Sequence, residues 1–342
     1  MVASESQTIN VLYACDNAFF EPLLVSLQSL VCNCTNNLCI YVISQGVSDH
    51  NKARANDVVA TRRIGIIWLE AWDYETAVNG SLYLGGYSAS MFSRFCLQSL
   101  LPESVSRIIY LDCDTVIMGD LVNLWEYPLR GKTLGAVNDY RSKRYARNLG
   151  LHAIPYLNSG VLVVDVDKYR ANNCEKRLFE ALGRYNGVLE FPDNDLLNIV
   201  LQDELAVIPL ENNAHSIIFS TKDYKELCFL RSPQDSGSEE EYLRAREHPV
   251  VIHYTRCFLV RGRPWQEHCN HPMQNRYDAY RTLVLGSQAP YAPFDASQVS
   301  LLRRFGGLLP RSVLIAVARF AHAFAKPTVQ RVQRKLRGAL DE

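Results

Sequence analysis

Short apolar runs alternate along the chain with longer segments in which apolar residues recur every three or four positions. The short runs are rich in β-branched and aromatic residues and predict strands, whereas the longer segments predict helices. The predicted strands are Ile9–Cys15, Cys39–Ser44, Arg63–Leu69, Ile108–Asp112, Leu134–Asn138, Ser159–Asp165 and Val250–Tyr254. The predicted helices are Phe19–Val31, Met91–Leu101, Tyr169–Arg184 and Asp195–Leu201.

This alternation of strands with helices predicts an α/β fold built on a mostly parallel sheet. In such a sheet, ligands bind beyond the carboxyl ends of the strands. Asp16 follows the first predicted strand, and Asp112 ends a later one. We therefore expect both carboxylates at the edge of the sheet where a ligand would bind.

Three segments depart from the alternation. Residues 232–241, Ser-Pro-Gln-Asp-Ser-Gly-Ser-Glu-Glu-Glu, are typical of a mobile surface loop. Residues 286–300 are rich in proline, alanine and serine and predict a linker. One domain is therefore expected over residues 1–285, followed by the linker and by a separate tail over residues 301–342.

The tail combines basic residues with aromatic and aliphatic ones, a pattern typical of an amphipathic helix that lies on a membrane surface. Anionic lipid would attract each basic side chain by about 1 kcal/mol. Pro327 is expected to break or kink this helix. The alternative is a C-terminal helix that packs on the domain with a solvated basic face. The basic residues are Arg303, Arg304, Arg311, Arg319, Lys326, Arg331, Arg334, Lys335 and Arg337.

Composition narrows the class of protein. The 342 residues include 36 basic and 36 acidic ones, so the overall charge does not favour a nucleic-acid partner. None of the 10 cysteines forms a C-x-x-C pair, which argues against a zinc ribbon or a thioredoxin-type site. Residues 1–8 lack the features of a signal peptide, and no apolar run is long enough to span a bilayer. We therefore expect a cytoplasmic protein, peripheral on the inner face of the membrane.

Two aspartates, Asp112 and Asp114, follow the apolar run that begins at Ile108. Carboxylates at the end of a buried strand are costly unless something pairs with them. Spaced by one residue, they can reach one cation together, and Mg²⁺ and Mn²⁺ favour such oxygen ligands along with those of a substrate phosphate. The pair indicates a metal-assisted site for a phosphorylated or nucleotide substrate. The alternative is an ordinary Asp-rich turn.

An ordered set of segments resembles glycosyltransferase family 8, over roughly Ile9 to Trp265. The resemblance implies a GT-A fold, which is Rossmann-like with a mixed central sheet and binds nucleotide-diphospho-sugars. It also implies a retaining, metal-dependent transfer from a UDP-sugar. The segments begin at Val11, Ser88, Tyr110, Leu134, Tyr156, Asp193 and His253.

The resemblance implies a donor site in which Asp16 accepts a hydrogen bond from the uracil and Phe19 stacks on it, while Arg94 lies near the diphosphate. Asp139 and Asn158 would bind the sugar. The residues implied to bind the donor are Ala14, Asp16, Phe19, Arg94, Asp112, Asp139, Asn158, Ser159 and Arg263. The basic residues after Asp139 are expected to form a solvated face, and they are Arg141, Lys143, Arg144 and Arg147.

The implied metal ligands are Asp112, Asp114 and His253, which would hold Mn²⁺ or Mg²⁺. The implied catalytic residues are Asp193, Asn194 and Asn158. Asn194 stands where the family often has a glutamine, so its side chain is shorter than usual. Asp195 is expected to cap the following helix. Gly160 would let the backbone approach the substrate.

The segment from His253 to Trp265 departs from the family pattern. Arg256 stands where a glycine is usual, and Arg263 replaces the lysine before Pro-Trp. An arginine can still hold a leaving diphosphate, but with a planar fork instead of a point charge. Arg261 is the competing candidate for that role.

The expected function is the transfer of a hexose from UDP-galactose or UDP-glucose to a saccharide or a lipid-linked glycan, in cell-surface polysaccharide synthesis. A metal-dependent nucleotidyltransferase is one alternative, although it gives no reason for the Asn-Ser-Gly segment at residue 158. A catalytically degenerate UDP-sugar-binding protein is another, motivated by Asn194 and by the altered segment after His253. A membrane-surface scaffold would leave the carboxylates unexplained.

Overall fold

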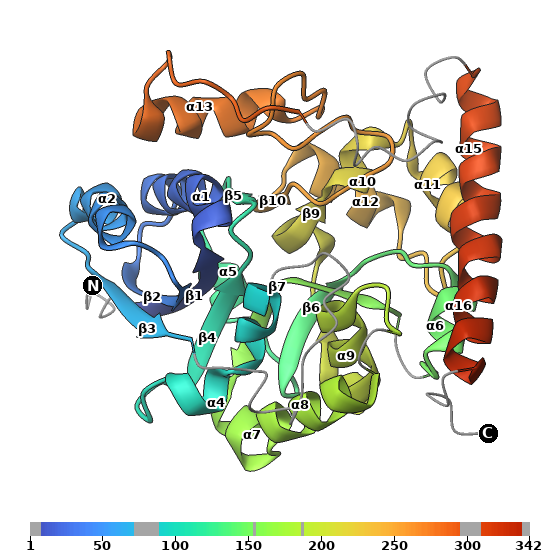
Figure 1. Ribbon diagram of the computed structural model, residues 1–342, viewed down its shortest axis with the longest axis horizontal. Coiled ribbons are helices and arrows are strands. Elements are labelled where there is room, and N and C mark those ends of the chain that lie inside the picture. The colour runs from blue at the N-terminus through green and yellow to red at the C-terminus, as the bar shows by residue number, and fades with distance from the viewer. Residues whose placement is uncertain (1–7, 72–88, 153–154, 186–187, 295–308, 337–342) are drawn as a thin grey trace.

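A seven-stranded sheet forms the centre of the computed structural model, which describes residues 8–71, 89–152, 155–185, 188–294 and 309–336 (Figure 1). Part of the predicted linker (residues 295–300) and the tail residues 301–308 and 337–342 lie outside these ranges, as does Ser88. In spatial order the strands are β3 (Ile66–Glu70), β2 (Asn37–Gln45), β1 (Thr8–Asp16), β4 (Arg107–Leu111), β7 (Leu157–Asp165), β6 (Leu134–Asn138) and β8 (Leu205–Val207).

One strand of this sheet, β7, runs against all the others. Strands β3, β2, β1 and β4 pair in parallel, as do β6 and β8. Strand β7 is antiparallel to both of its neighbours, β4 and β6. The start of β7 therefore lies at the same edge as the carboxyl ends of β1, β4 and β6. The expectation of a mostly parallel, mixed sheet is confirmed.

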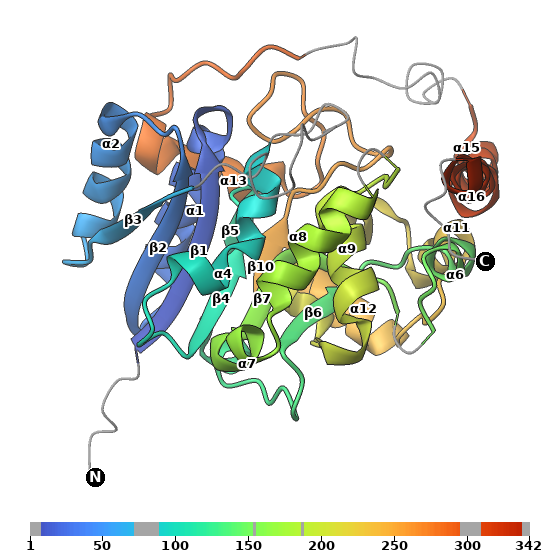
Figure 2. The ribbon, with the colours of Figure 1, turned by 60° about the horizontal axis from the view of Figure 1, so that its bottom comes forward.

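The alternating side chains of the strands build two cores, one on each face of the sheet. In β4, Ile109 and Leu111 enter one core, whereas Ile108 and Tyr110 enter the other. The first core is covered by α1 (Phe20–Asn33), α2 (Asp49–Ala60) and α13 (Gln274–Leu285). The second is covered by α4 (Leu97–Leu100), α7 (Val166–Ala171), α8 (Cys174–Tyr185) and α9 (Pro192–Leu201) (Figure 2).

A second, three-stranded sheet continues from the end of β4. It consists of β5 (Thr115–Ile117), β10 (Val251–His253) and β9 (Ala214–His215). Strand β10 pairs antiparallel with β5, so that His253 lies opposite Thr115. The other α-helices that the structure describes before the tail are α5 (Val122–Trp125), α6 (Lys143–Asn148), α10 (Ser216–Ser220), α11 (Tyr224–Arg231) and α12 (Glu239–Glu247).

Two predicted helices are broken into shorter pieces. The segment predicted as Met91–Leu101 is a 3₁₀ helix, η2 (Ala89–Phe95), followed by α4. In a 3₁₀ helix, residues three apart lie above one another, and here Phe92 and Phe95 both enter the same core. The segment predicted as one helix from Tyr169 is divided between α7 and α8 at Asn173, which has a φ of 49° that ends a helix.

Two predicted boundaries also shift. Helix α9 begins at Pro192, three residues before the predicted start at Asp195, because proline fits the first turn of a helix. The predicted loop over residues 232–241 is shorter than expected, since α12 begins at Glu239. The hydroxyl of Ser238 caps α12 by accepting from the N–H of Glu241 at 3.1 Å.

The tail forms one continuous helix along an edge of the molecule, beside α11 and α6 (Figures 1 and 2). It consists of α15 (Arg311–Arg319), a π-helical segment, η6 (Phe320–Ala325), and α16 (Lys326–Leu336). The predicted break at Pro327 is absent. The N–H of Lys326 donates to the carbonyl of Ala321, five residues back, and this widened turn accommodates the proline ring.

The inner face of the tail helix packs on the domain, as the alternative prediction required. Ile315, Ala318 and Ala323 are buried there. Asn148 on α6 donates a hydrogen bond to the carbonyl of Pro327 at 2.7 Å, which anchors the second half of the helix. None of the helices in the described ranges is long and apolar enough to cross a membrane.

Candidate active site

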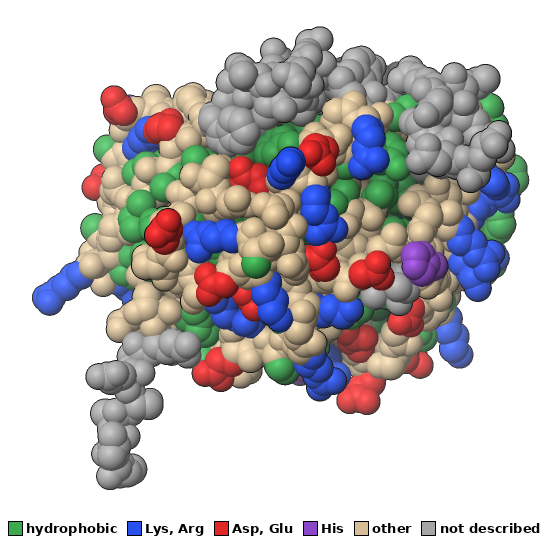
Figure 3. All heavy atoms as spheres, turned by 90° about the horizontal axis from the view of Figure 1, so that it is seen from below, with side chains coloured by type: hydrophobic (Ala, Val, Ile, Leu, Met, Phe, Trp, Pro, Cys, Tyr) green, Lys and Arg blue, Asp and Glu red, His purple; other side chains and the backbone are tan. Residues whose placement is uncertain are grey.

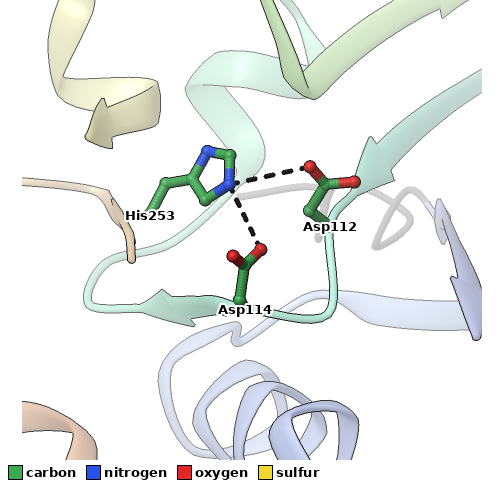
Figure 4. A group of neighbouring side chains, drawn as sticks. All are labelled: Asp112, Asp114 and His253. Carbon is green, nitrogen blue, oxygen red and sulfur yellow. Dashed lines mark ion pairs between the residues drawn. The ribbon is translucent and has the colours of Figure 1, made fainter. Parts of the chain in front are cut away.

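Three side chains converge where the two sheets meet. Asp112 follows β4, Asp114 precedes β5, and His253 ends β10. Their ligand atoms all lie within 4.8 Å of one another. The Nε2 atom of His253 lies 3.6 Å from Asp112 Oδ2 and 3.2 Å from Asp114 Oδ1 (Figure 4). Two carboxylates and an imidazole in this arrangement are a suitable ligand set for Mn²⁺ or Mg²⁺.

Asn213 sets the orientation of the histidine ring. Its Oδ1 atom lies 2.9 Å from His253 Nδ1, while its Nδ2 atom donates to Asn158 Oδ1 at 2.9 Å. Because the amide donates to Asn158 through nitrogen, its oxygen accepts from the histidine. This assigns the proton to Nδ1 and turns the lone pair of Nε2 toward the carboxylates, as a metal-binding histidine requires.

The charges at this centre shift the protonation of its members. Burial would lower the pKa of His253, but Asp114 and Asp112 outweigh burial and raise it. Burial would raise the pKa of Asp114, but His253 and Arg263 lower it to about 2. The centre therefore favours an ionised Asp114 with a positive charge beside it. A divalent cation can supply that positive charge in place of the imidazole proton.

Gly160 makes room for this centre. A Cβ atom at this position would lie 2.0 Å from His253 Cε1 and 2.9 Å from Asp112 Oδ2. The Gly160 carbonyl accepts from the N–H of Asp112 at 2.8 Å, which holds β7 against the end of β4. The structure therefore requires a glycine here because of the histidine and aspartate side chains, and the approach of the backbone to the substrate stays a prediction.

Arg94 connects three parts of the site. Its Nη2 atom lies 2.8 Å from Asp112 Oδ1, and its Nη1 atom lies 3.0 Å from Asp193 Oδ2. Nη1 also donates to Ser159 Oγ at 2.9 Å. Tyr110, which the sequence did not single out, donates its hydroxyl to Asp112 Oδ1 at 2.8 Å. These contacts leave Asp112 Oδ2 facing His253.

Two adjoining cavities, of about 290 and 220 Å³, surround these residues and share Phe19, Asp112, Asp114, Asp193 and Arg263. Together they are lined by every predicted site residue except Asp16. Residues found in the smaller cavity alone are Ala14, Met91, Arg94, Tyr110 and Cys113. Residues in the larger cavity alone include Asp139, Asn158, Ser159, Asn194 and His253.

Asp16 has a structural role in addition to any role in binding. Its Oδ1 atom accepts from the N–H groups of Ala18 and Phe19, each at 3.0 Å, and so caps the short 3₁₀ turn η1 (Asn17–Phe19). This turn positions Phe19, which lines both cavities and packs edge-to-face on Trp265 with ring centres 5.8 Å apart.

Of the two candidate arginines after β10, Arg263 lies in the site and Arg261 does not. Arg263 Nη2 lies 2.9 Å from Asp114 Oδ2, and its guanidinium stacks on Trp265 at 5.0 Å. It also donates to the carbonyl of Tyr254. Arg261 is exposed and stacks on Phe294 at 4.7 Å.

Asp139, which follows β6, lines the larger cavity and not the smaller one. Its Oδ2 accepts from Arg141 Nε at 2.7 Å, and its Oδ1 lies 3.5 Å from His215 Nε2. Burial would raise the pKa of Asp139, but Arg141 and His215 lower it. Burial lowers the pKa of His215 to about 4, so its imidazole is neutral at pH 7.

The expectation that Arg141 belongs to a solvated face is wrong, because this residue pairs with Asp139 and stacks on Phe191 at 4.0 Å. An apolar ring and a buried carboxylate at the right distance outweigh solvation for its long side chain. The solvated face exists further along the chain, at the exposed residues Lys143, Arg144 and Arg147.

Helix α9 brings Asp193 and Asn194 to the site, and Asp195 supports the start of the helix. Asn194 Oδ1 accepts from the backbone N–H of Ser159 at 2.6 Å, which ties α9 to the start of β7. Asp195 is fully buried and accepts from the hydroxyls of Tyr145 and Tyr156 at 2.8 and 2.6 Å. The prediction that Asp195 caps this helix is wrong, because α9 begins earlier and its N-cap is Phe191. Asp195 instead accepts from the N–H of Phe191 at 3.2 Å and so stabilises the beginning of α9 from inside the helix.

Sequence reasoning missed Asn213 and His215, because they lie in a 3₁₀ turn, η4 (Leu210–Asn213), and in a two-residue strand with no hydrophobic period. The one available signal was the group of polar residues Asn212, Asn213 and His215, shortly after the apolar residues 205–210. Two arginines that line the larger cavity, Arg231 and Arg256, were also missed as site residues.

Sequence comparison relates this chain to known glycosyltransferases. The model of the family described as Glycosyl transferase family 8 matches residues 10–269. General stress protein A of Bacillus subtilis (strain 168) is 26% identical over 247 residues, which are 70% of this chain and 81% of that protein. The lipopolysaccharide 1,2-glucosyltransferase of Escherichia coli (strain K12) is 23% identical over 278 residues, covering 80% of this chain and 77% of the relative.

Among solved structures, that of the galactosyltransferase LgtC in complex with donor and acceptor sugar analogs superposes with a TM-score of 0.66 at 21% identity. The match covers 82% of this chain and 98% of LgtC. This likeness shows the shared fold, which is GT-A. Because the family model spans most of the sequence and the fold agrees with it, the chain belongs to glycosyltransferase family 8 and is a glycosyltransferase.

Proposed function

We propose that this glycosyltransferase moves a hexose, galactose or glucose, from a UDP-sugar to a saccharide or lipid-linked glycan acceptor, with retention of configuration. The observation that carries the proposal is the convergence of Asp112, Asp114 and His253 between two adjoining cavities. Arg94 and Arg263 flank this convergence with permanent positive charge, which suits a diphosphate.

The two cavities suggest how the donor lies. The smaller one, lined by Ala14, Phe19 and Arg94, suits the uridine and the diphosphate. The larger one suits the hexose and the acceptor, because the oxygens of Asp139 and Asn158 face it and can bind sugar hydroxyls. The shared wall at Asp112 and Asp114 would then lie beside the bond that breaks.

Transfer breaks the bond between the anomeric carbon and the β-phosphate oxygen, and negative charge develops on the departing diphosphate. A divalent cation held by Asp112, Asp114 and His253 would supply Lewis-acid stabilisation of that charge. Arg94 and Arg263 would add electrostatic stabilisation. Arg94 has a second role, because it holds Asp112 and Asp193 in position at the same time.

Retention without a covalent intermediate fits the position of Asn194. Its side-chain oxygen accepts the N–H of Ser159, and an amide is a poor nucleophile in any case. We therefore assign Asn194 to positioning. The acceptor hydroxyl would attack on the face that the diphosphate leaves, and the departing β-phosphate oxygen would take its proton.

A hydrolysis panel tests the proposal without knowledge of the acceptor. UDP release is measured with UDP-galactose, UDP-glucose and UDP-N-acetylglucosamine, in the presence of Mn²⁺, Mg²⁺ or EDTA. We expect release from one of the two hexoses, and loss of that release in EDTA or in His253→Ala. The control is His248→Ala, since His248 is an exposed histidine on the same segment. Full activity of His253→Ala, or full activity in EDTA, would contradict the metal site.

We further propose that the tail helix holds the enzyme on an anionic membrane surface. Its outer face carries a row of apolar residues at helical spacing, whose side chains are 39% to 66% exposed, namely Val313, Val317, Phe320 and Phe324. Lys and Arg side chains gather along the edge where the tail and α6 lie (Figure 3). An exposed apolar row beside basic residues suits the interface of an anionic bilayer.

A further inference from the structure

Arg231, at the C-terminal end of α11, has no ionic or hydrogen-bonding partner in the described part of the chain. Its Nε atom is buried and donates to no acceptor. The other arginines of the site differ in this respect, because Arg94, Arg141 and Arg263 each pair with an aspartate. Arg231 is half-buried. A guanidinium whose buried Nε–H has no acceptor, and which makes no ion pair of its own, is costly, so its retention needs an explanation.

The local surroundings do not remove this cost. Burial lowers the pKa of Arg231, and the neighbouring Arg141 lowers it further, while Asp139 and Glu190 act in the opposite direction without restoring it. Both carboxylates already pair with another cation, Asp139 with Arg141 and Glu190 with Lys326. The end of α11 offers the favourable field of a helix C-terminus, but that field is worth less than the penalty for desolvating a guanidinium. The positive charge of Arg231 is therefore left over for something outside the chain.

A small hollow of about 20 Å³ between α6, α11 and the tail helix adjoins the larger cavity, since Arg141, Phe191 and Arg231 line both. Its remaining charges are balanced. Lys326 Nζ of the tail lies 3.3 Å from Glu190 Oε1, and Arg141 pairs with Asp139. Burial, together with the nearby cations, lowers the pKa of His322 to about 4, so this histidine is neutral at pH 7.

We propose that Arg231, with Arg141 beside it, binds an anionic group, a phosphate or a carboxylate, on the acceptor saccharide. The inference rests on the proposed function and adds to it the class of acceptor. The site lies in the cavity that would hold the sugar, which Arg94 does not line, and the tail helix borders it through His322 and Lys326.

The geometry suits an anion in two further ways. Arg141 is held in place by Asp139 through Nε and by Phe191 through stacking, so little freedom is lost when its Nη groups bind. Arg256, which is exposed, adds a positive side chain to the same cavity. Guanidinium groups grip phosphates and carboxylates with paired hydrogen bonds, which neutral sugars do not offer.

The test uses the full chain, saturated with UDP and Mg²⁺ so that the diphosphate positions are filled. Galactose 6-phosphate, galacturonic acid and galactose are titrated by calorimetry up to millimolar concentrations. We expect at least one acidic sugar to bind about tenfold more tightly than galactose. A preference for the phosphate or for the carboxylate identifies which anion the site takes. Equal affinities for all three, or no binding of either acidic sugar, would overturn the inference.

Substitutions of Arg231 test whether this residue causes the preference for acidic sugars. Arg231→Met should reduce the preference to about twofold or less, and Arg231→Lys should keep part of it. Arg144→Met is the matched control, because Arg144 is an exposed arginine on nearby α6, and it should keep the full preference. Without ligand, Arg231→Met should melt at or above the temperature of the unsubstituted protein, since it removes an uncompensated charge. A lower melting temperature would reveal a structural partner and overturn the inference.

These outcomes are separable from a failure of the proposed function. If UDP does not bind in the presence of Mg²⁺ or Mn²⁺, the proposed function fails. If UDP binds and no acidic sugar is preferred, the anionic subsite alone is wrong.

Discussion

Asn213 accepts a hydrogen bond from the Nδ1–H of His253 at 2.9 Å, and the same amide donates to Asn158 at 2.9 Å. One residue thus fixes both the tautomer of the histidine and the position of a residue in the sugar-facing cavity. We expect Asn213→Ala to weaken Mn²⁺ binding in the presence of UDP by about 10–100-fold, because the histidine loses the bond that presents Nε2. Calorimetric titration of Mn²⁺ measures this.

The neighbouring Asn212 is a matched control for this prediction. Its amide donates to the carbonyl of Pro209 at 3.1 Å and does not contact the histidine. Asn212→Ala should therefore leave the affinity for Mn²⁺ unchanged, even if the protein melts at a lower temperature. Unaltered Mn²⁺ affinity in Asn213→Ala would show that His253 is oriented by its packing alone.

Gly160→Ala should disrupt the metal centre. The added methyl group would lie 2.0 Å from His253 Cε1, a distance that forces the ring or β7 to move. We expect UDP release to fall at least about tenfold, because small misplacements of reacting groups are costly. Gly183→Ala in α8 is the control. A Cβ there meets no atom within 4 Å, and helix propensity predicts a stabilisation of up to about 1 kcal/mol. Full activity of Gly160→Ala would show that the ring of His253 can move without loss of function.

If the tail helix binds anionic membranes, a single negative charge on its outer face should weaken that binding. Phe320→Glu replaces the most exposed ring of the apolar row by a carboxylate, which anionic lipid repels. Co-sedimentation with vesicles that contain phosphatidylserine should fall at least about fivefold. Leu283→Glu on α13 serves as the control, since this leucine is equally exposed on another edge of the molecule and its variant should sediment normally. If both variants bind the vesicles equally well, the tail helix is not the membrane anchor.

The buried imidazole of His271 should make the protein less stable in mild acid. It is 4% exposed, its Nε2 lies 3.1 Å from Ser216 Oγ, and its Nδ1 accepts from the N–H of Met273, so protonation would remove an acceptor. Burial, helped by Arg263, lowers its pKa to about 4. The folded pKa lies below the unfolded value of about 6.5, so the unfolded state binds more protons between these values and stability falls as the pH falls through this window.

Urea unfolding at about pH 7.5 and about pH 5 measures this effect. The histidine should account for about 2 kcal/mol of the loss, which His271→Gln should remove from the difference between the two pH values. His50→Gln, at an exposed position, should leave the difference as it is. An equal pH difference in all three proteins would mean that His271 does not titrate in this way.

Much of the central sheet could be predicted because its strands are buried runs with a clear start and end. Strand β4 is the best example, and it led directly to Asp112 and Asp114. The direction of β7 could not be predicted from its own residues, since Leu157–Asp165 reads as a buried strand whichever way it runs. Helix α2 was missed because it buries only Ala55 and Val59, too few residues for a periodic pattern.

The candidate site divides in the same way. Asp139 and Asn158, which adjoin strong strands, were predicted through the family resemblance, and both line the larger cavity. Asn213, Arg141 and Arg231 were not predicted, because what distinguishes them is their partners or the absence of partners. Such relations are fixed only when distant segments pack together.

The reversal of β7 also determines which changes in length the enzyme can tolerate. Residues Leu157 to Gly160 lie between β4 and β6, where Asp112 and Asp139 are anchored to Gly160 and Tyr156. An insertion or deletion of one residue within β7 would exchange its two faces and remove Asn158 and Gly160 from the site together. The loop before Ser238 contacts the domain mainly through its backbone, as in the hydrogen bond from Asn138 to the carbonyl of Asp235, and a change of length there reverses no strand. Evolutionary variation in chain length should therefore accumulate in this loop rather than in β7.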